Sequence, residues 1–132
     1  MNEFIDANIL LRYLTGEPAD QSQRARALID GETALIVPEV ALMEAAYTLR
    51  TQYGVAREQI VDTLIEFVEK KNIRVHNLDR DIVIEALRLC RPSNRVNFGD
   101  AMIWAAVRCA QPARLYSFDE RFPTGEVEVR RP

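Results

Sequence analysis

The sequence has few of the residues on which many catalytic sites are built. Its 132 residues include two cysteines and one histidine, and it has no CxxC or HExxH pattern and no glycine-rich phosphate loop. Zinc sites, serine–histidine and cysteine–histidine mechanisms and P-loop nucleotide binding therefore have no support. The one histidine, His76, falls in a predicted strand. No apolar run approaches the roughly 18 residues of a membrane-spanning helix.

The cysteines and the start of the chain indicate a cytoplasmic protein. Cys90 and Cys109 both fall in predicted helices, and we expect buried thiols of a reducing, bacterial-type cytosol rather than a disulfide. The opening MNEFIDANILL has no basic n-region and no small-residue cleavage site, so we expect no secretory signal.

The composition is that of an ordinary soluble globule. With 48% hydrophobic and 28% charged residues, residues 1–132 are expected to form a single domain with its own core. The net charge of −3 argues against a basic surface that coats nucleic acid. Only Lys70 and Lys71 are lysines. The many arginines suit bidentate phosphate contacts, although a codon bias toward arginine explains them equally well.

Predicted strands and helices alternate along the chain. Strands are expected over residues 2–5, 33–37, 73–78, 113–118 and 126–130, and helices over 7–14, 20–29, 39–53, 56–71, 80–90 and 98–110. Pro38 suits the first turn of a helix, Gly54 suits a helix end, and Pro92 stops the helix before it. This alternation is typical of an α/β domain with a parallel sheet.

Four acidic residues lie beside or inside apolar segments: Asp6 in FIDANILL, Glu44 in ALMEAAYTL, Asp100 in FGDAMIWAAV and Asp119 in LYSFDERF. A carboxylate removed from water is costly unless it is compensated, and clustered carboxylates resist ionising. A divalent cation reverses both effects, because Mg²⁺ and Mn²⁺ select hard oxygen ligands. The pattern predicts an acidic Mg²⁺ or Mn²⁺ pocket.

The placement of these acids favours one shared pocket. Asp6 follows the first predicted strand and Asp119 follows the fourth. Sites in open parallel sheets form beyond the carboxyl ends of the strands, where the strand order reverses. Glu44 and Asp100, on helices, can complete such a pocket, and phosphodiester hydrolysis is the chemistry that suits it best.

Three of the four acids also have a structural interpretation. Asp6 and Asp100 each stand near the start of a predicted helix, where aspartate is a favoured N-cap. Asp119 can close an Asx-turn. Glu44 differs, because it shares a helix face with Val40, Ala41 and Tyr47, which a solvent-facing glutamate should avoid. A functional role is the better explanation for Glu44.

With these residues identified, the chain resembles the PIN-domain family and, within it, the VapC-type toxins of bacterial toxin–antitoxin pairs. The motifs that carry the resemblance are FIDANILLRYL, VPEVALMEAAYTL, NFGDAMIWAAV and LYSFDERF. It implies a three-layer α/β/α sandwich around a parallel sheet of order 3-2-1-4-5. It also implies a Mg²⁺- or Mn²⁺-dependent endoribonuclease that cleaves RNA, forms a homodimer and is inhibited by a small antitoxin protein.

The resemblance also implies roles for individual residues. The acidic site and metal ligands would be Asp6, Glu44, Asp100 and Asp119, and the supporting polar groups would be Asn8 and Ser117. Many relatives carry a further aspartate where this chain has Asn97, which would weaken a second metal position without abolishing the first. RNA phosphate contacts are predicted at Arg12, Arg95 and Arg121, for which a plain solvated surface is the alternative.

Two other functions remain open at this point. The substitution at Asn97 is compatible with a catalytically weakened, PIN-like module that only binds RNA. A receiver-type signalling domain also has an acidic Mg²⁺ pocket. That fold requires an acidic neighbour for Asp6 and a lysine after the last strand, and no lysine follows Lys71.

Overall fold

The computed structural model describes residues 1–132 as six helices and four short strands. The helices are α1 (Ala7–Thr15), α2 (Ala19–Ile29), α3 (Glu39–Thr51), α4 (Arg57–Val68), α5 (Arg80–Leu89) and α6 (Phe98–Cys109). The strands are β1 (Leu35–Val37), β2 (Ile73–Val75), β3 (Arg114–Tyr116) and β4 (Glu128–Arg130). All six predicted helices are therefore confirmed, whereas the first predicted strand is reduced to a single bridge at Phe4.

The helix ends follow local rules that the sequence carries. Gly16 ends α1 with a φ of 77°, and its N–H donates to the Arg12 carbonyl, a left-handed cap that glycine adopts without strain. Asp79 begins α5, where its carboxylate accepts from the N–H groups of Asp81 and Ile82. Pro38 occupies the N-cap of α3. The helix limits therefore coincide with residues that favour helix ends in the sequence.

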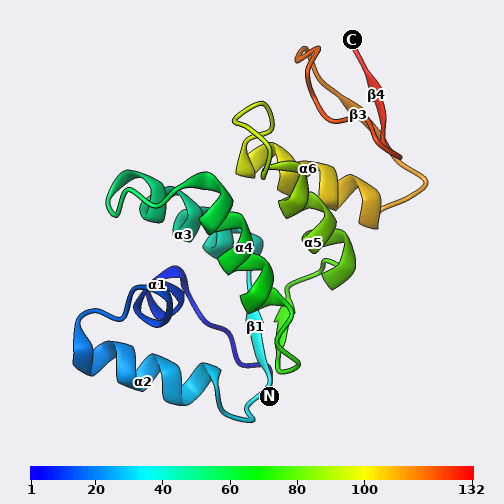
Figure 1. Cartoon of the computed structure of the whole chain (residues 1–132). Helices are drawn as coiled ribbons and strands as arrows, with labels where there is room; N and C mark the ends of the chain where they lie inside the picture. The colour runs from blue at the N-terminus through cyan, green and yellow to red at the C-terminus, as the bar shows by residue number, and fades with distance from the viewer.

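The helices pack around one apolar core. α1 lies against α2 and α3, α4 lies between α3 and α5, and α6 packs on both α5 and α3 (Figure 1). The core is a single cluster of 33 buried residues. The apolar stripe predicted on α4 is buried as expected: Ile60, Val61, Leu64, Ile65 and Val68. No helix combines the length and the apolar character needed to cross a bilayer.

The strands form two separate parallel pairs. β1 pairs with β2, with Leu35 opposite Ile73, and Phe4 bridges to the other edge of β1 at Ile36. β3 pairs with β4 in a second sheet. Parallel α/β structure is thus confirmed, but the expected single sheet of order 3-2-1-4-5 is divided after its third member. In that order the N-terminal segment counts as the first strand, so the first sheet contains β2, β1 and the Phe4 segment side by side. The second sheet contains the last two strands, β3 and β4.

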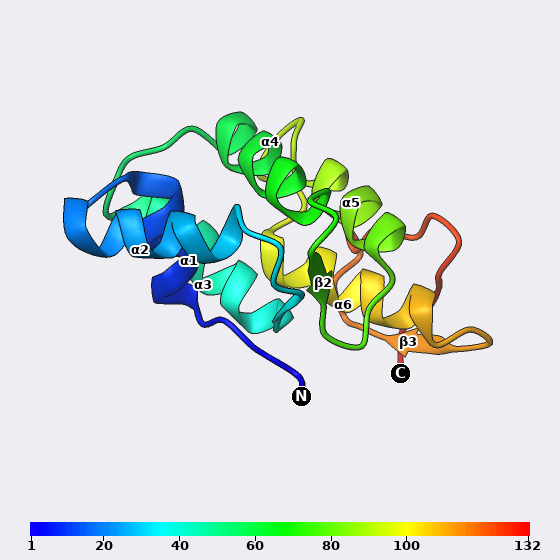
Figure 2. The ribbon, with the colours of Figure 1, turned by 90° about the horizontal axis from the view of Figure 1, so that it is seen from below.

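The sheet is divided where the segment between β3 and β4 makes its own contacts with α6. The Trp104 indole on α6 donates to the Gly125 carbonyl over 3.0 Å, and Arg108 forms an ion pair with Glu126 at 3.0 Å. Phe122 and Val127 are buried in the core cluster. β3 and β4 are therefore held on α6, away from the N-terminal segment, in both ribbon views (Figures 1 and 2).

The two cysteines are free and have different surroundings. Cys90 is buried, and burial raises the pKa of its thiol to about 11. Cys109, at the end of α6, is exposed, so the expectation that both thiols are buried is wrong for this residue. Its sulfur lies at the start of α5, where it accepts from the Asp79 N–H over 3.4 Å.

Candidate metal site and nucleic-acid surface

Asp6 and Glu44 line one open hollow of about 570 Å³ between the N-terminal segment, α1 and α3. The rest of its wall is mostly apolar and includes Phe4, Ile9 and Val40. Asp6 is the N-cap of α1, and its Oδ1 accepts from the Ile9 N–H over 3.0 Å. The Asp6 Oδ2 atom has no hydrogen-bond partner in the chain, so one hard oxygen remains available in the hollow.

Glu44 is exposed rather than buried. It does share a face of α3 with Val40 and Tyr47, as the helical spacing predicts, but these side chains are 59% and 62% exposed. The apolar side chains expected around Glu44 are therefore present on α3, but no other element covers them. Nothing in the chain packs over this part of α3, which leaves the Glu44 carboxylate hydrated.

Asp100 lies in the first turn of α6 and is only partly exposed. It is not the N-cap of this helix. Asn97 has that position, and its side-chain oxygen accepts from the Asp100 N–H over 2.7 Å. Because Asn97 caps the helix, the Asp100 carboxylate is not needed as a cap. The Asp100 carboxylate places a negative charge at the N-terminus of α6, the favourable end of the helix dipole.

Asp119 follows β3 in an exposed turn. Its Oδ1 accepts from the Arg121 N–H over 2.8 Å, which is the expected Asx-turn. The Ser117 hydroxyl oxygen in turn accepts from the Asp119 N–H over 3.0 Å. Ser117 therefore orients the backbone that carries Asp119.

The structure brings together two of the four acids. Asp6 and Glu44 share a hollow, while Asp100 and Asp119 lie outside it. No three acidic, histidine or cysteine side chains are close enough to hold one metal ion. None of the four acids forms an ion pair with a lysine or arginine. The donor types fit a hard divalent cation, but one chain alone does not assemble the complete set.

A second hollow, of about 430 Å³, adjoins the first and has basic walls. Arg12 of α1 and Arg24 of α2 line it together with Asn8. The two hollows share Ile9 and Leu28, so Arg12 lies close to the Asp6 hollow. Arg24 was missed in the sequence, because the polar face of its helix gives no sign of what lies beside it.

The other two predicted phosphate contacts lie elsewhere. Arg95 is exposed in the loop before α6, and Arg121 is exposed after Asp119. Neither lines the hollows around Asp6 and Arg12. Their surroundings in a single chain are those of solvated surface arginines.

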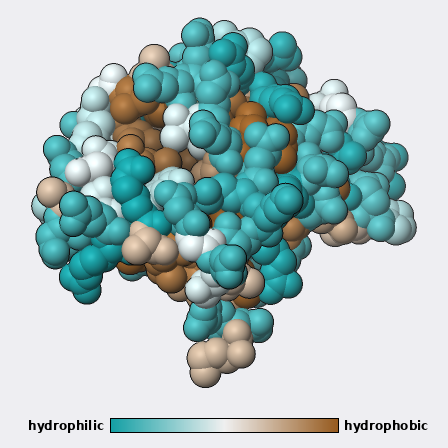
Figure 3. All heavy atoms as spheres, turned by 60° about the horizontal axis from the view of Figure 1, so that its bottom comes forward, coloured by the Kyte–Doolittle hydropathy of each residue, from teal (hydrophilic) through white to brown (hydrophobic).

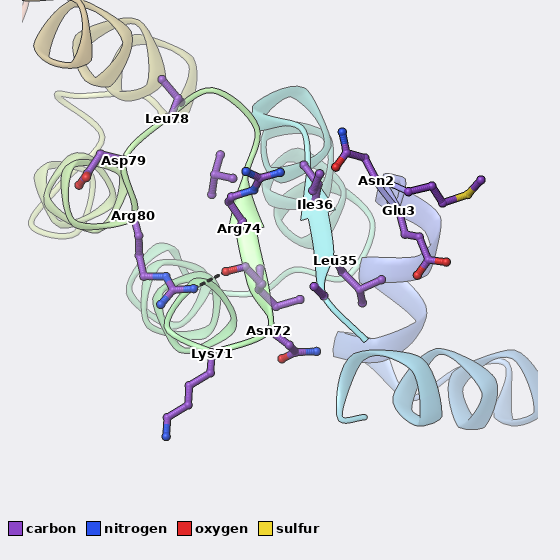
Figure 4. Close-up of a pocket in the computed structure, with 14 residues that line it drawn as sticks. Asn2, Glu3, Leu35, Ile36, Lys71, Asn72, Arg74, Leu78, Asp79 and Arg80 are labelled. Atoms are coloured by element: carbon purple, nitrogen blue, oxygen red, sulfur yellow. Dashed lines mark hydrogen bonds between the residues drawn. The ribbon is translucent and has the colours of Figure 1, made fainter. Parts of the chain in front are cut away.

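A further hollow, of about 520 Å³, lies beside β1 and β2 and contains none of the predicted acids. Figure 4 shows its mixed lining, with Glu3 and Asp79 among the acids and Lys71 and Arg74 among the bases. Arg80 extends across it and donates to the Ile73 carbonyl. This arginine ties the start of α5 to β2, which is a structural role.

Apolar surface is exposed in several places between polar side chains on the face drawn in Figure 3. Among the large apolar side chains left in solvent, three belong to the segments that carry Asp6 and Asp119. Phe4 is 50% exposed, Tyr116 is 59% exposed and Phe118 is 75% exposed. Exposed apolar side chains thus lie close in sequence to both Asp6 and Asp119.

Comparison with known families gives one match. The family model described as PIN domain matches residues 4–125, which include all four acids. No curated protein matches the sequence.

Proposed function

Because the chain belongs to the PIN domain family, we propose that it is a divalent-metal-dependent endoribonuclease. PIN domains are in general metal-dependent nucleases, and PIN nucleases in general bind RNA. The observation that carries the proposal is the extent of the match, from residue 4 to residue 125. It favours hydrolysis of phosphodiester bonds over the receiver-type signalling function, which belongs to another family.

The proposed metal ligands are Asp6, Glu44, Asp100 and Asp119, with Mg²⁺ or Mn²⁺ as the ion. A divalent ion in such a site activates water and offsets charge on the phosphate oxygens. None of these four carboxylates is engaged in an ion pair within the chain, so each remains available to a cation. One chain does not bring all four of these carboxylates together, so a complete site needs more than the arrangement within a single chain.

The RNA backbone is proposed to lie along the basic hollow beside Asp6. Arg12 and Arg24 supply positive charge there, and Asn8 supplies an amide next to the acidic hollow. Arginine fits phosphate oxygens bidentately. A phosphate held by these residues would adjoin the Asp6 carboxylate, where the scissile bond must lie.

The proposed biological role is that of the toxin in a toxin–antitoxin pair, with a small antitoxin protein as inhibitor. The support is the resemblance of four motifs to VapC-type toxins: FIDANILLRYL, VPEVALMEAAYTL, NFGDAMIWAAV and LYSFDERF. Induced expression of the chain in a bacterial host tests this role. Growth should stop with the native chain and continue with the Asp6→Asn variant.

A catalytically weakened RNA-binding module is the second candidate, because the four acids do not converge within one chain. The two candidates differ in turnover rather than in binding. If RNA binds with unchanged affinity and is never cleaved with Mg²⁺, Mn²⁺ or other divalent ions, the binding module is the correct function.

Cleavage of a labelled RNA by purified Asp6→Asn protein tests the enzyme directly. We expect at least a roughly 10²-fold loss of cleavage rate, because loss of one charged group at a phosphoryl-transfer site typically costs that much. Asparagine is as good an N-cap as aspartate, so the free energy of unfolding should change by no more than about 0.5 kcal/mol. A chelator should abolish cleavage by the native protein.

Asp79→Asn is the matched control, because Asp79 is likewise an exposed aspartate at the N-cap of a helix and accepts from backbone N–H groups. It should cleave RNA at the native rate. Equal cleavage rates for the native and Asp6→Asn proteins would show that Asp6 is not part of the active site.

A further inference from the structure

We propose that the acidic site is completed by a second copy of this chain, in which β3 of each copy pairs with the N-terminal strand segment of the other. Each site would then contain three of the four proposed ligands: Asp6 and Glu44 of one copy, and Asp119 of the other. The assignment of these acids as one metal site rests on the proposed function. The strand pairing itself rests on the geometry of two unpaired sheet edges.

The first unpaired edge is at Phe4. The Ile5 N–H donates to the Ile36 carbonyl over 2.9 Å, and the Glu3 carbonyl accepts from the Ile36 N–H over 2.8 Å. Because backbone groups alternate along a strand, the N–H and C=O of Phe4 point away from β1. Neither has a hydrogen-bond partner in the chain. Such an edge is a template for pairing with another strand.

The second unpaired edge is on β3. The Ser117 N–H donates to the Arg130 carbonyl of β4 over 3.0 Å. By the same alternation, the Arg114 carbonyl and the Tyr116 N–H point to the opposite side, where no strand pairs with β3. The second sheet therefore also ends in an open row of backbone groups.

The two edges match in direction and register. All pairings in both sheets are parallel. With Phe4 opposite Leu115, the Phe4 N–H reaches the Arg114 carbonyl and the Tyr116 N–H reaches the Phe4 carbonyl. Two residues further along both strands, Ser117 comes opposite Asp6. Asp119 then lies beyond the carboxyl end of β3, at the same end of the assembled sheet as Asp6 and the hollow that Asp6 lines.

The edges of one chain do not face each other. β3 and β4 are fixed on α6 by the Trp104–Gly125 hydrogen bond and the Arg108–Glu126 ion pair. In both ribbon views the N-terminal segment and β3 lie apart, and the C-terminal sheet lies beside α6 (Figures 1 and 2). A second copy can supply the missing edge without breaking any of these contacts.

Reciprocal pairing explains the apolar surface around the separated acids. Phe4, Tyr116 and Phe118 are half to three-quarters exposed, and each belongs to a segment that the pairing would cover. Two-fold symmetry closes the arrangement, because each copy offers both edges and uses both. The result is two continuous parallel sheets, each assembled from two chains and each with one acidic pocket.

Cross-linking between differently tagged copies tests the pairing. One copy carries Phe4→Cys and the other Leu115→Cys, both in a Cys109→Ser background that removes the exposed native thiol. Neighbouring strands lie about 4.8 Å apart, within the range for a disulfide. After co-refolding and oxidation, we expect a disulfide-linked mixed dimer that neither variant forms alone. Arg88→Cys in place of Leu115→Cys should give no link, because Arg88 is exposed on α5 away from either edge.

Two results would overturn the inference. If a chain carrying both substitutions forms only an internal link while the mixture forms none, the sheet closes within one molecule. A light-scattering mass of one chain for the native protein, with no link in any sample, would show that the edges never meet. The Tyr116→Pro variant, which removes the outward N–H and leaves β4 pairing intact, should be monomeric where the native protein is dimeric.

These readouts do not depend on catalysis. A cross-linked dimer that cleaves no RNA would refute the proposed nuclease and leave the paired sheet in place. An active monomer would do the reverse.

Discussion

At the scale of single residues, Asp6 and Asp119 each use one carboxylate oxygen to hold a backbone N–H and leave the other free. Asp6 accepts from Ile9 and Asp119 accepts from Arg121. Such a bond orients the carboxylate and removes none of its charge. The structural and catalytic interpretations of these aspartates are therefore compatible, and the sequence alone could not have separated them. The Glu44 carboxylate has no such hydrogen bond within the chain. Its orientation therefore depends on what packs against its face of α3.

A cluster at Asp30 gives a prediction for pH dependence. The Tyr13 hydroxyl donates to Asp30 over 2.7 Å, and the Lys70 ammonium lies 2.9 Å from the same oxygen. Both hydrogen bonds lower the pKa of Asp30 below its ordinary 3.8, the Tyr13 bond most. A lowered carboxyl pKa stabilises the fold above the ordinary pKa, and this stabilisation is lost as the pH falls through the native value.

We therefore expect Asp30→Asn to lower the free energy of unfolding by about 1 kcal/mol at pH 7, a small value because the pair is half exposed. At pH 3 and below, the difference from the native protein should shrink. Urea unfolding at both pH values measures it. Asp20→Asn is the control, since Asp20 forms only an exposed 3.6 Å pair with Arg24. A constant difference at all pH values would contradict this role of Asp30.

At the scale of elements, helices were predictable and strand pairing was not. The limits of α1 and α5 follow from short-range signals such as Asp6, Gly16 and Asp79. The strands are three residues long, so their pairing depends on contacts between distant segments. Periodicity placed Val40 and Glu44 on one face of α3, but it could not tell whether another element covers that face.

The cap of α6 gives a prediction at this scale. Asn97 accepts from the Asp100 N–H over 2.7 Å at the N-cap. Asn97→Ala should lower the free energy of unfolding by about 1 kcal/mol, and Asn97→Asp should retain the native value within about 0.5 kcal/mol. Chemical denaturation followed by circular dichroism measures both. Asn94→Ala, at an exposed loop residue without a side-chain hydrogen bond, should have no effect; an equal loss there would exclude the capping explanation.

At the scale of the whole molecule, the order within each half of the sheet could be predicted, but the junction between the halves could not. β1 lies between β2 and Phe4, and β3 lies beside β4, as the expected order requires. The pairing that the expected order still requires would join Phe4 to β3, and the sequence is the same whether these edges come from one chain or two. Loop geometry and the anchoring of β3 on α6 decide between them, and neither is a local property of the sequence.

A complementation experiment tests the composition of the site at this scale. Asp6→Asn and Asp119→Asn proteins should each be inactive alone, because every site in either dimer lacks one ligand. In a mixed dimer with exchanged edges, one site lacks both aspartates and the other has both. Random association makes half of the dimers mixed, so co-refolding equal amounts should restore about a quarter of the native RNA cleavage rate. Sites built within single chains would give no restoration, since each would keep its own defect. Mixing two samples of Asp6→Asn protein, which should remain inactive, controls for recovery on refolding.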